Sequence, residues 1–153
     1  NGSNGMPQNR EKANELWLKA GELGCAEAYD NLGHSHYAGR GVEIDKMKAK
    51  HYWELAAMNG NVMARHTLGI TEGQVGIHHR AMKHFLLAAK AGYNTSLDSV
   101  KIGFVNGIVS KDDYASALRE YQKSTDEMKS DAREAAAEIL ARGGDLSHRR
   151  RRR

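Results

Sequence analysis

Small and aromatic residues recur along this chain at fixed steps of 36 and 32 residues. Trp17, Trp53, Phe85 and Tyr121 are joined by steps of 36, 32 and 36. The same steps align further columns of small residues: Ala13–Ala49–Ala81–Ala117, Ala20–Ala56–Ala88 and Gly24–Gly60–Gly92. Because one set of steps aligns several independent columns, we infer a chain built from a repeated structural unit.

Each unit is expected to hold two helices. Residues 45–59 carry an apolar stripe at helical spacing, formed by Ala49, Tyr52, Trp53, Ala56 and Ala57. Asp45 is expected to cap this helix, and Gly60 to end it in the left-handed conformation. Residues 26–37 are expected to form the first helix, with Ala28, Leu32 and His36 on one face. Gly39 and Gly41 would turn the chain between the two helices.

This pattern resembles the Sel-one-like repeat (SLR) family, relatives of the tetratricopeptide α-solenoids. The best copy of the family motif comprises Ala28, Leu32, Gly33, Gly39, Gly41, Val42, Asp45, Lys48, Ala49, Tyr52, Trp53, Ala56, Ala57 and Gly60. Weaker copies cover nearly the whole chain. His36 stands at the usual tyrosine position, and Lys101 stands where the third unit should have a glycine. The resemblance implies an all-α, right-handed α–α superhelix (solenoid) of helix–loop–helix repeats and a role as a protein-interaction adaptor.

The repeat steps also give expected boundaries. We expect an SLR solenoid over residues 1–142, made of a partial repeat 1–24 and repeats at about 25–60, 61–92 and 93–128. The loop of the second unit, within "EGQVGIHH", is shorter by the difference between the two steps. A terminal capping helix is expected at about 130–142, on the register of Ala132, Ala136 and Leu140. Gly143 and Gly144 should stop this helix, leaving 143–153 as a flexible basic tail.

The net charge of the chain is concentrated at its end. The formal charge is +4, but Arg149, Arg150, Arg151, Arg152 and Arg153 contribute five positive charges, which leaves residues 1–148 slightly acidic. A nucleic-acid-binding surface built into the fold would need its own cluster of cations, and none shows. The tail could bind polyanions as an import signal or an electrostatic anchor on nucleic acid or anionic lipid. Alternatively, it is a solvated end or an appended segment.

The sequence indicates no catalytic, cofactor or metal site. His34 and His36 are two residues apart and should lie on different sides of a helix. His78, His79 and His84 lack a carboxylate or cysteine at ligand spacing. Cys25 begins a helix without a histidine in a recognisable relation to it, and "GRGV" lacks the strand and the Gly-Lys-Ser/Thr ending of a phosphate loop. We therefore expect a protein that is not an enzyme.

The inner surface of the solenoid is the predicted site of function. In related solenoids the first helix of each unit lines the concave face. The residues there that change character between units are Asp30, Asn31, His34, Arg65, His66 and Ile70. A groove of this kind would bind a helix or an extended peptide. One alternative is a substrate-docking region of a larger protein, such as a ubiquitin ligase with a RING-type module. Another is nucleic-acid binding through the tail.

Composition indicates the cellular compartment in which the chain is expected to work. No apolar run approaches the roughly 20 residues that span a bilayer, and the first residues, "NGSNGMPQNR", do not resemble a signal peptide. Cys25 is the single cysteine, which is typical of a reducing compartment. We expect an intracellular monomer, cytoplasmic or nuclear, without membrane insertion and with a protein or peptide partner.

Overall fold

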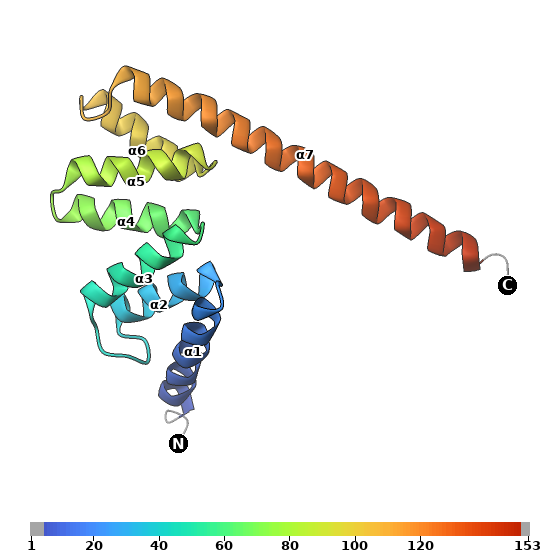
Figure 1. Cartoon of the computed structure of the whole chain (residues 1–153), viewed down its shortest axis with the longest axis horizontal. Coiled ribbons are helices and arrows are strands. Elements are labelled where there is room, and N and C mark those ends of the chain that lie inside the picture. Colours follow the sequence, from blue (N-terminus) through green and yellow to red (C-terminus); the bar gives the residue numbers. More distant parts are fainter. Residues whose placement is uncertain (1–4, 151–153) are drawn as a thin grey trace.

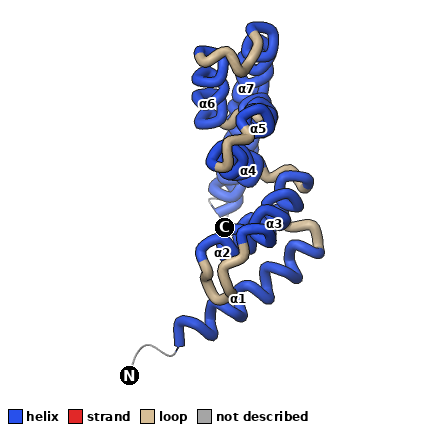
Figure 2. The backbone as a smooth tube through the Cα atoms, turned by 90° about the vertical axis from the view of Figure 1, so that its left-hand side faces the viewer, coloured by secondary structure: helices blue, strands red, loops and turns tan. Residues whose placement is uncertain are grey.

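Helices in sequential contact make up the fold. The computed structural model describes the backbone of residues 5–150 and the side chains of residues 8–142. Within that part the chain forms seven helices and no strand (Figures 1 and 2). They are α1 (Gly5–Glu22), α2 (Ala26–Ala38), α3 (Lys46–Met58), α4 (Val62–Gln74), α5 (His78–Lys90), α6 (Asn94–Val105) and α7 (Lys111–Arg150). The prediction of an all-α helical-repeat solenoid is confirmed. None of the described helices is long and apolar enough to cross a membrane.

The hairpin of α2 and α3 forms as the sequence predicts. Asp45 caps α3, with its Oδ1 atom accepting hydrogen bonds from the backbone N–H groups of Met47 at 3.1 Å and Lys48 at 3.0 Å. Gly60 follows α3 with a φ of 91°, in the left-handed region that a side chain would penalise. Local sequence signals therefore set both ends of this helix.

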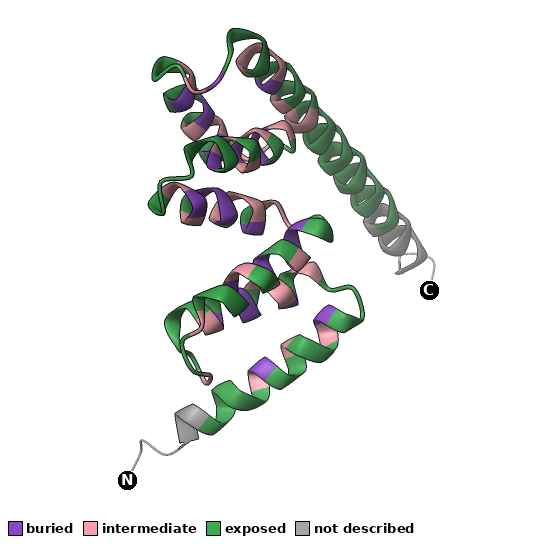
Figure 3. Cartoon of the chain, turned by 60° about the vertical axis from the view of Figure 1, so that its left-hand side comes forward, coloured by how far each residue is buried: buried purple, intermediate pink, exposed green. Residues whose placement is uncertain are grey.

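Small residues let the two helices of a hairpin approach closely. A Cβ atom on Gly33 would collide with the indole ring of Trp53, and one on Gly69 would lie 2.6 Å from Cε1 of Phe85. Trp53 and Phe85 are accordingly buried, as Figure 3 shows for the helix faces that meet. Around them lie two apolar clusters, comprising Ala49, Trp53, Ala56, Ala57, Ala64 and Leu68, and Ala81, Phe85, Ala89, Val100, Val109 and Ala117. The glycine and the ring thus form one packing unit.

Burial of the other rings is less complete than the repeat predicts. Trp17, Tyr52 and Tyr121 are half-buried, whereas Trp53 has only 2% of its surface exposed. Trp17 lies on α1, and no described helix supplies it with a facing glycine of the kind that Gly33 provides for Trp53. The two buried rings, Trp53 and Phe85, are therefore those that face a glycine of the first helix.

The predicted capping helix is wrong. Residues 130–142 belong to α7, which continues as one helix to Arg150, and residues 126–142 are exposed throughout. In Figure 1 this part of α7 runs away from the body. Gly24, Gly60 and Gly92 turn the chain after α1, α3 and α5 with φ between 91° and 96°. Met128 occupies the next position of this glycine column, so the helix continues there.

The basic tail is described only in part. Gly143 and Gly144 do not stop the helix, since the backbone of α7 remains helical through Arg149 and Arg150. The side chains of all five tail arginines lie outside the described residues.

Candidate protein-binding surface

The six residues predicted to bind a partner lie on the first helices of two hairpins. Asp30, Asn31 and His34 are on α2, whereas Arg65, His66 and Ile70 are on α4. The structure divides them by accessibility: three are exposed (Asn31, His34 and Ile70) and three are half-buried (Asp30, Arg65 and His66).

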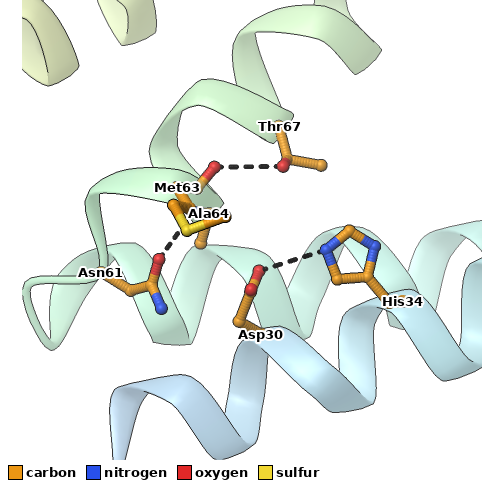
Figure 4. A network of polar contacts seen from close by, with 6 residues as sticks. All are labelled: Asp30, His34, Asn61, Met63, Ala64 and Thr67. Atoms are coloured by element: carbon orange, nitrogen blue, oxygen red, sulfur yellow. Dashed lines mark hydrogen bonds and ion pairs between the residues drawn. The ribbon is translucent and has the colours of Figure 1, made fainter. Parts of the chain in front are cut away.

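Asp30 and His34 form a pair one helical turn apart. His34 Nε2 lies 3.6 Å from Asp30 Oδ1, with the histidine side chain 48% exposed and the aspartate side chain 13% exposed. Figure 4 shows the two side chains pointing toward one another on α2, beside the start of α4. Burial raises the pKa of Asp30, and the neighbouring His34 opposes that shift. The edge of the His34 ring also contacts Trp53, with centroids 5.2 Å apart, so His34 presents a fixed imidazole to solvent.

Arg65 joins α4 to the helix before it. Its Nη2 atom donates a 2.9 Å hydrogen bond to the backbone carbonyl of Ala57. One of the five N–H donors of its guanidinium group is therefore engaged within the fold.

His66 joins α4 to the helices after it. Its Nδ1 atom makes a 2.7 Å hydrogen bond with the hydroxyl of Ser96, which is fully buried. The ring packs between Phe85 and Tyr93, with centroids 5.2 and 5.1 Å away. Burial lowers the pKa of His66, which favours the neutral imidazole. Packing between repeats is thus a role that the sequence analysis did not assign to this residue.

The two exposed members on α2 border a hollow between α1 and α2. Asn31 and His34 line a cavity of about 330 Å³ together with Arg10, Ala13, Trp17, Ser35 and Arg40. This cavity combines an indole ring with two guanidinium groups, a chemistry suited to a partner with apolar and acidic side chains.

Sequence reasoning missed two exposed residues on α6. Ile102 is 61% exposed and Val105 is 75% exposed, and both line a shallow hollow of about 360 Å³. Ile102 follows Ile70 by the 32-residue step, just as Ile70 follows His34 by the 36-residue step. The exposed residues His34, Ile70 and Ile102, here called the His34 column, therefore run along α2, α4 and α6. Extending the repeat step would have found Ile102.

Other candidate chemistry is not assembled in the described part. No group of three or more His, Cys, Asp or Glu side chains among these residues could hold a metal ion. His34 contacts Trp53 while His36 stacks on Tyr52, at 5.4 Å between centroids, in agreement with their predicted separation on the helix. Cys25 is exposed at the N-cap of α2, without a side-chain capping bond.

Comparison with known proteins agrees with this arrangement. The family model for the Sel1 repeat matches residues 1–25, 26–61 and 78–93, about half of the chain. The chain belongs to the Sel1 repeat family. A crystal structure of a Sel1 repeat protein from Oxalobacter formigenes superimposes with a TM-score of 0.61 at 18% identity, covering 76% of this chain and 49% of that chain. That likeness shows the shared fold.

One curated relative of this Sel1 repeat protein has a stated role. It is the ERAD-associated E3 ubiquitin-protein ligase component HRD3A from Arabidopsis thaliana, 32% identical over 92 residues. The match covers 60% of this chain but only 13% of the relative. This Sel1 repeat protein thus corresponds to a small part of that protein.

Proposed function

We propose that this chain is a non-catalytic protein-interaction scaffold that holds a partner along the first helices of its repeats. The observation that carries the proposal is the exposure of the His34 column, while Trp53, Phe85 and the patterned alanines of α3, α5 and α7 are buried in packing. Residues left exposed at the same repeat position on successive first helices offer a surface that a helix or extended peptide can follow. Membership of the Sel1 repeat family supports the same role.

The six predicted residues have two different roles on this surface. Asn31, His34 and Ile70 contact the partner directly, because they are exposed. Asp30, Arg65 and His66 fix the surface, since their polar atoms already bind within the fold or are shielded by it.

Co-purification with matched surface variants tests the proposal. The binding variant combines His34→Ala with Ile70→Asp, which changes two exposed side chains and leaves Arg65 and His66 in place. The control is Leu87→Asp on α5, where Leu87 is 50% exposed. A specific partner should be recovered with the natural chain and the control and be lost with the binding variant. Retention by the binding variant, together with an unchanged circular dichroism spectrum, would contradict the proposal.

A second candidate function is a substrate-docking region within a larger ubiquitin ligase. The role of the Arabidopsis relative as a ubiquitin-protein ligase component supports it, as does the small share of that protein that the match covers. Reading the natural gene around this segment and identifying the co-purified proteins test it together. A gene with no RING-type module and a set of partners without ligase components would remove this candidate.

The same proposal includes the repeat boundaries, the cellular compartment and the monomeric state of the chain. We expect the units near 25–60, 61–92 and 93–128 to act as packing units of an intracellular monomer. The lone, exposed Cys25 is compatible with a reducing compartment. Sedimentation of the purified chain checks the monomeric state.

A further inference from the structure

A cavity of about 430 Å³ opens at the loop edge of the molecule, between the α2/α3 and α4/α5 hairpins. Its apolar lining comprises Tyr37, Met47, Trp53, Val75 and Ile77, and its polar lining comprises Lys46, Lys50, Thr71, Glu72 and Gln74. Met47 is 76% exposed and Val75 is 71% exposed. This loop-edge cavity therefore presents apolar surface to solvent among basic side chains.

The loop-edge cavity follows from a difference between two loops. The α2–α3 connection has seven residues, 39–45, whereas the α4–α5 connection has three, 75–77. Both loops are closed by the same backbone hydrogen bond: Asp45 N–H donates to His36 O at 2.9 Å, and Ile77 N–H donates to Glu72 O at 2.9 Å. Glu72 lies one 36-residue step after His36. The shorter α4–α5 loop thus keeps the backbone hydrogen bond that closes the loop. It lacks the residues that form the middle of the α2–α3 loop.

The longer loop covers the helix that precedes its hairpin. Gly41 lies so close to α1 that a Cβ atom on it would be 2.7 Å from the carbonyl carbon of Arg10 and 2.9 Å from the backbone nitrogen of Glu11. Asn14 donates a 2.8 Å hydrogen bond from Nδ2 to the backbone carbonyl of Arg40. Residues of the loop therefore supply both a glycine contact and a carbonyl acceptor to α1.

The corresponding surface of α3 has no such cover. One 36-residue step leads from Arg10, Glu11 and Asn14 to Lys46, Met47 and Lys50, which all line the loop-edge cavity. In Figure 1 the α2–α3 and α4–α5 connections lie on the same edge of the molecule. The shortened loop therefore leaves open on α3 the surface that the longer loop covers on α1.

Buried charge at the wall of the cavity is incompletely paired. Glu72 is 2% exposed, and its Oε1 atom lies 2.7 Å from Lys50 Nζ and 3.2 Å from an Arg80 guanidinium nitrogen. The hydrogen bond from Lys50 holds the pKa of Glu72 below its ordinary value, so the carboxylate is ionised. Its Oε2 atom has no hydrogen-bond partner among the side chains and backbone that the structure describes. A buried acceptor of this kind favours a ligand that brings an N–H donor.

We propose that the loop-edge cavity binds an extended peptide segment of a partner protein, which occupies the place that residues 41–44 occupy over α1. The segment places a small residue against Met47 and an apolar side chain between Val75 and Ile77. Its backbone carbonyl accepts from Lys50, and its backbone N–H donates to Glu72 Oε2.

The bound segment also carries acidic residues beside that apolar side chain, which match the positive charge of the cavity. Lys46, Lys50 and Arg80 outnumber the single carboxylate of Glu72 at this site, so the local charge is positive. The loop "GRGVEID", residues 39–45, has this chemistry, with a glycine, Val42 and the acidic Glu43 and Asp45. No residue of the His34 column lines this cavity, and its contact with the column is that of Trp53 with His34.

The probe is the seven-residue peptide Gly39–Asp45 with blocked ends, titrated into the full chain and followed by nuclear magnetic resonance. Chemical shifts should change at the cavity residues and saturate with a dissociation constant on the order of 1 mM or tighter. Met47→Glu should weaken binding about tenfold or more by placing a carboxylate in the cavity. Met58→Glu is the matched control, since Met58 is 80% exposed on the same helix and lies outside the cavity.

A graft tests the same fit within one chain. Replacing Val75–Ile77 by the sequence of residues 39–45 restores the 36-residue step and should cover α3. The grafted chain should unfold at a higher temperature and should no longer bind the peptide. If the graft does not fold, the Met47→Glu and Met58→Glu pair decides the question alone.

Four outcomes of the binding experiments would overturn the proposal: no shifts at several times the expected dissociation constant, equal binding by Met47→Glu, equal binding of a peptide with Glu43 and Asp45 replaced by lysine, or binding retained by a folded graft. A dimer of the purified chain that dissociates in Met47→Glu would make a second copy the occupant, and would also overturn it.

Discussion

The α2/α3 and α6/α7 hairpins occupy equivalent places in the repeat and pack differently. In the first, Gly33 lies directly against the Trp53 ring, and the ring is buried. In the second, Lys101 stands at the glycine position and is exposed, and Tyr121 at the ring position is half-buried. A lysine side chain needs room where the glycine leaves none, so the ring cannot lie against the first helix.

The helix α7 compensates by packing on the preceding hairpin. It makes more extensive contact with α5 than with α6. Ser124 donates a 2.7 Å hydrogen bond to the backbone carbonyl of Lys90 at the end of α5, whereas the Tyr121 hydroxyl reaches only Asn94, the first residue of α6, at 3.3 Å. One glycine therefore decides whether the second helix of a unit packs mainly on its own first helix or on its neighbour.

Removing the two equivalent rings should give the largest difference between the hairpins. Trp53→Ala should lower the free energy of unfolding by about 3–5 kcal/mol, because a buried indole leaves a cavity. Tyr121→Ala should cost about 1 kcal/mol, since the ring is half-buried. Urea denaturation followed by circular dichroism measures both. Equal losses would show that the glycine contact does not distinguish the hairpins.

Adding a methyl group at the two equivalent first-helix positions should have a smaller effect. Gly33→Ala gains about 1 kcal/mol of helix propensity but overpacks against Trp53, which costs about 1–3 kcal/mol, so we expect no net gain and up to about 2 kcal/mol of loss. Lys101→Ala is the matched change at an exposed site and should stay within about 0.5 kcal/mol of the natural chain. Thermal unfolding compares them. A clear stabilisation by Gly33→Ala would mean that the ring has room to move.

Restoring the glycine column in α7 should change its shape more than its stability. Met128→Gly costs about 1 kcal/mol of helix propensity and supplies the residue that turns the chain after α1, α3 and α5. Spin labels at positions 118 and 139, with Cys25 replaced by serine, should be about 32 Å apart in the straight helix.

The glycine variant should shorten or broaden that distance, because residues 129–142 can then fold back as a first helix. Ser130→Gly is the control, at an exposed helical position outside the column. If it changes the distance as much as Met128→Gly does, helix weakening alone explains the result.

Lowering the pH should have the smallest effect on stability. It acts through His66, which joins α4 to α6 by its hydrogen bond with Ser96. Burial lowers the pKa of His66 from its ordinary 6.5, so the unfolded chain takes up a proton first. The stabilisation is complete above that ordinary pKa and is lost as pH falls below it. The melting temperature should therefore decrease as the pH is lowered from about 7.5 to about 5.

Burial also lowers the pKa of His36 and His84, which adds to the same trend. Melting temperatures of His66→Gln measured across this range should show a shallower slope than those of the natural chain, whereas His79→Gln, at an exposed position, should not. Parallel slopes in all three would exclude His66 as a source of the pH dependence.

The parts of the fold that could be predicted from sequence are those set by local signals and by the repeat step. Asp45 and Gly60 give the ends of α3, and the alanine and ring columns give its buried face. The same register was misleading after residue 128, because Ala132, Ala136 and Leu140 fit a capping helix while Met128 removes the turn that such a helix requires.

The candidate surface was less predictable because side-chain partners lie far apart in the sequence. His66 and Ser96 are 30 residues apart, and nothing local to His66 shows that its imidazole is engaged between repeats. Ile102 could have been found by the repeat step. The loop-edge cavity required the structure, since a shorter loop in the sequence does not show what it uncovers.

Amide hydrogen exchange tests most directly whether contacts between small residues and rings hold the hairpins together. We predict that amides in α2 and α3 exchange about 100-fold or more slowly than those of residues 129–142, whose side chains are all exposed. Equal protection in these two regions would contradict the role given to Gly33 and Trp53.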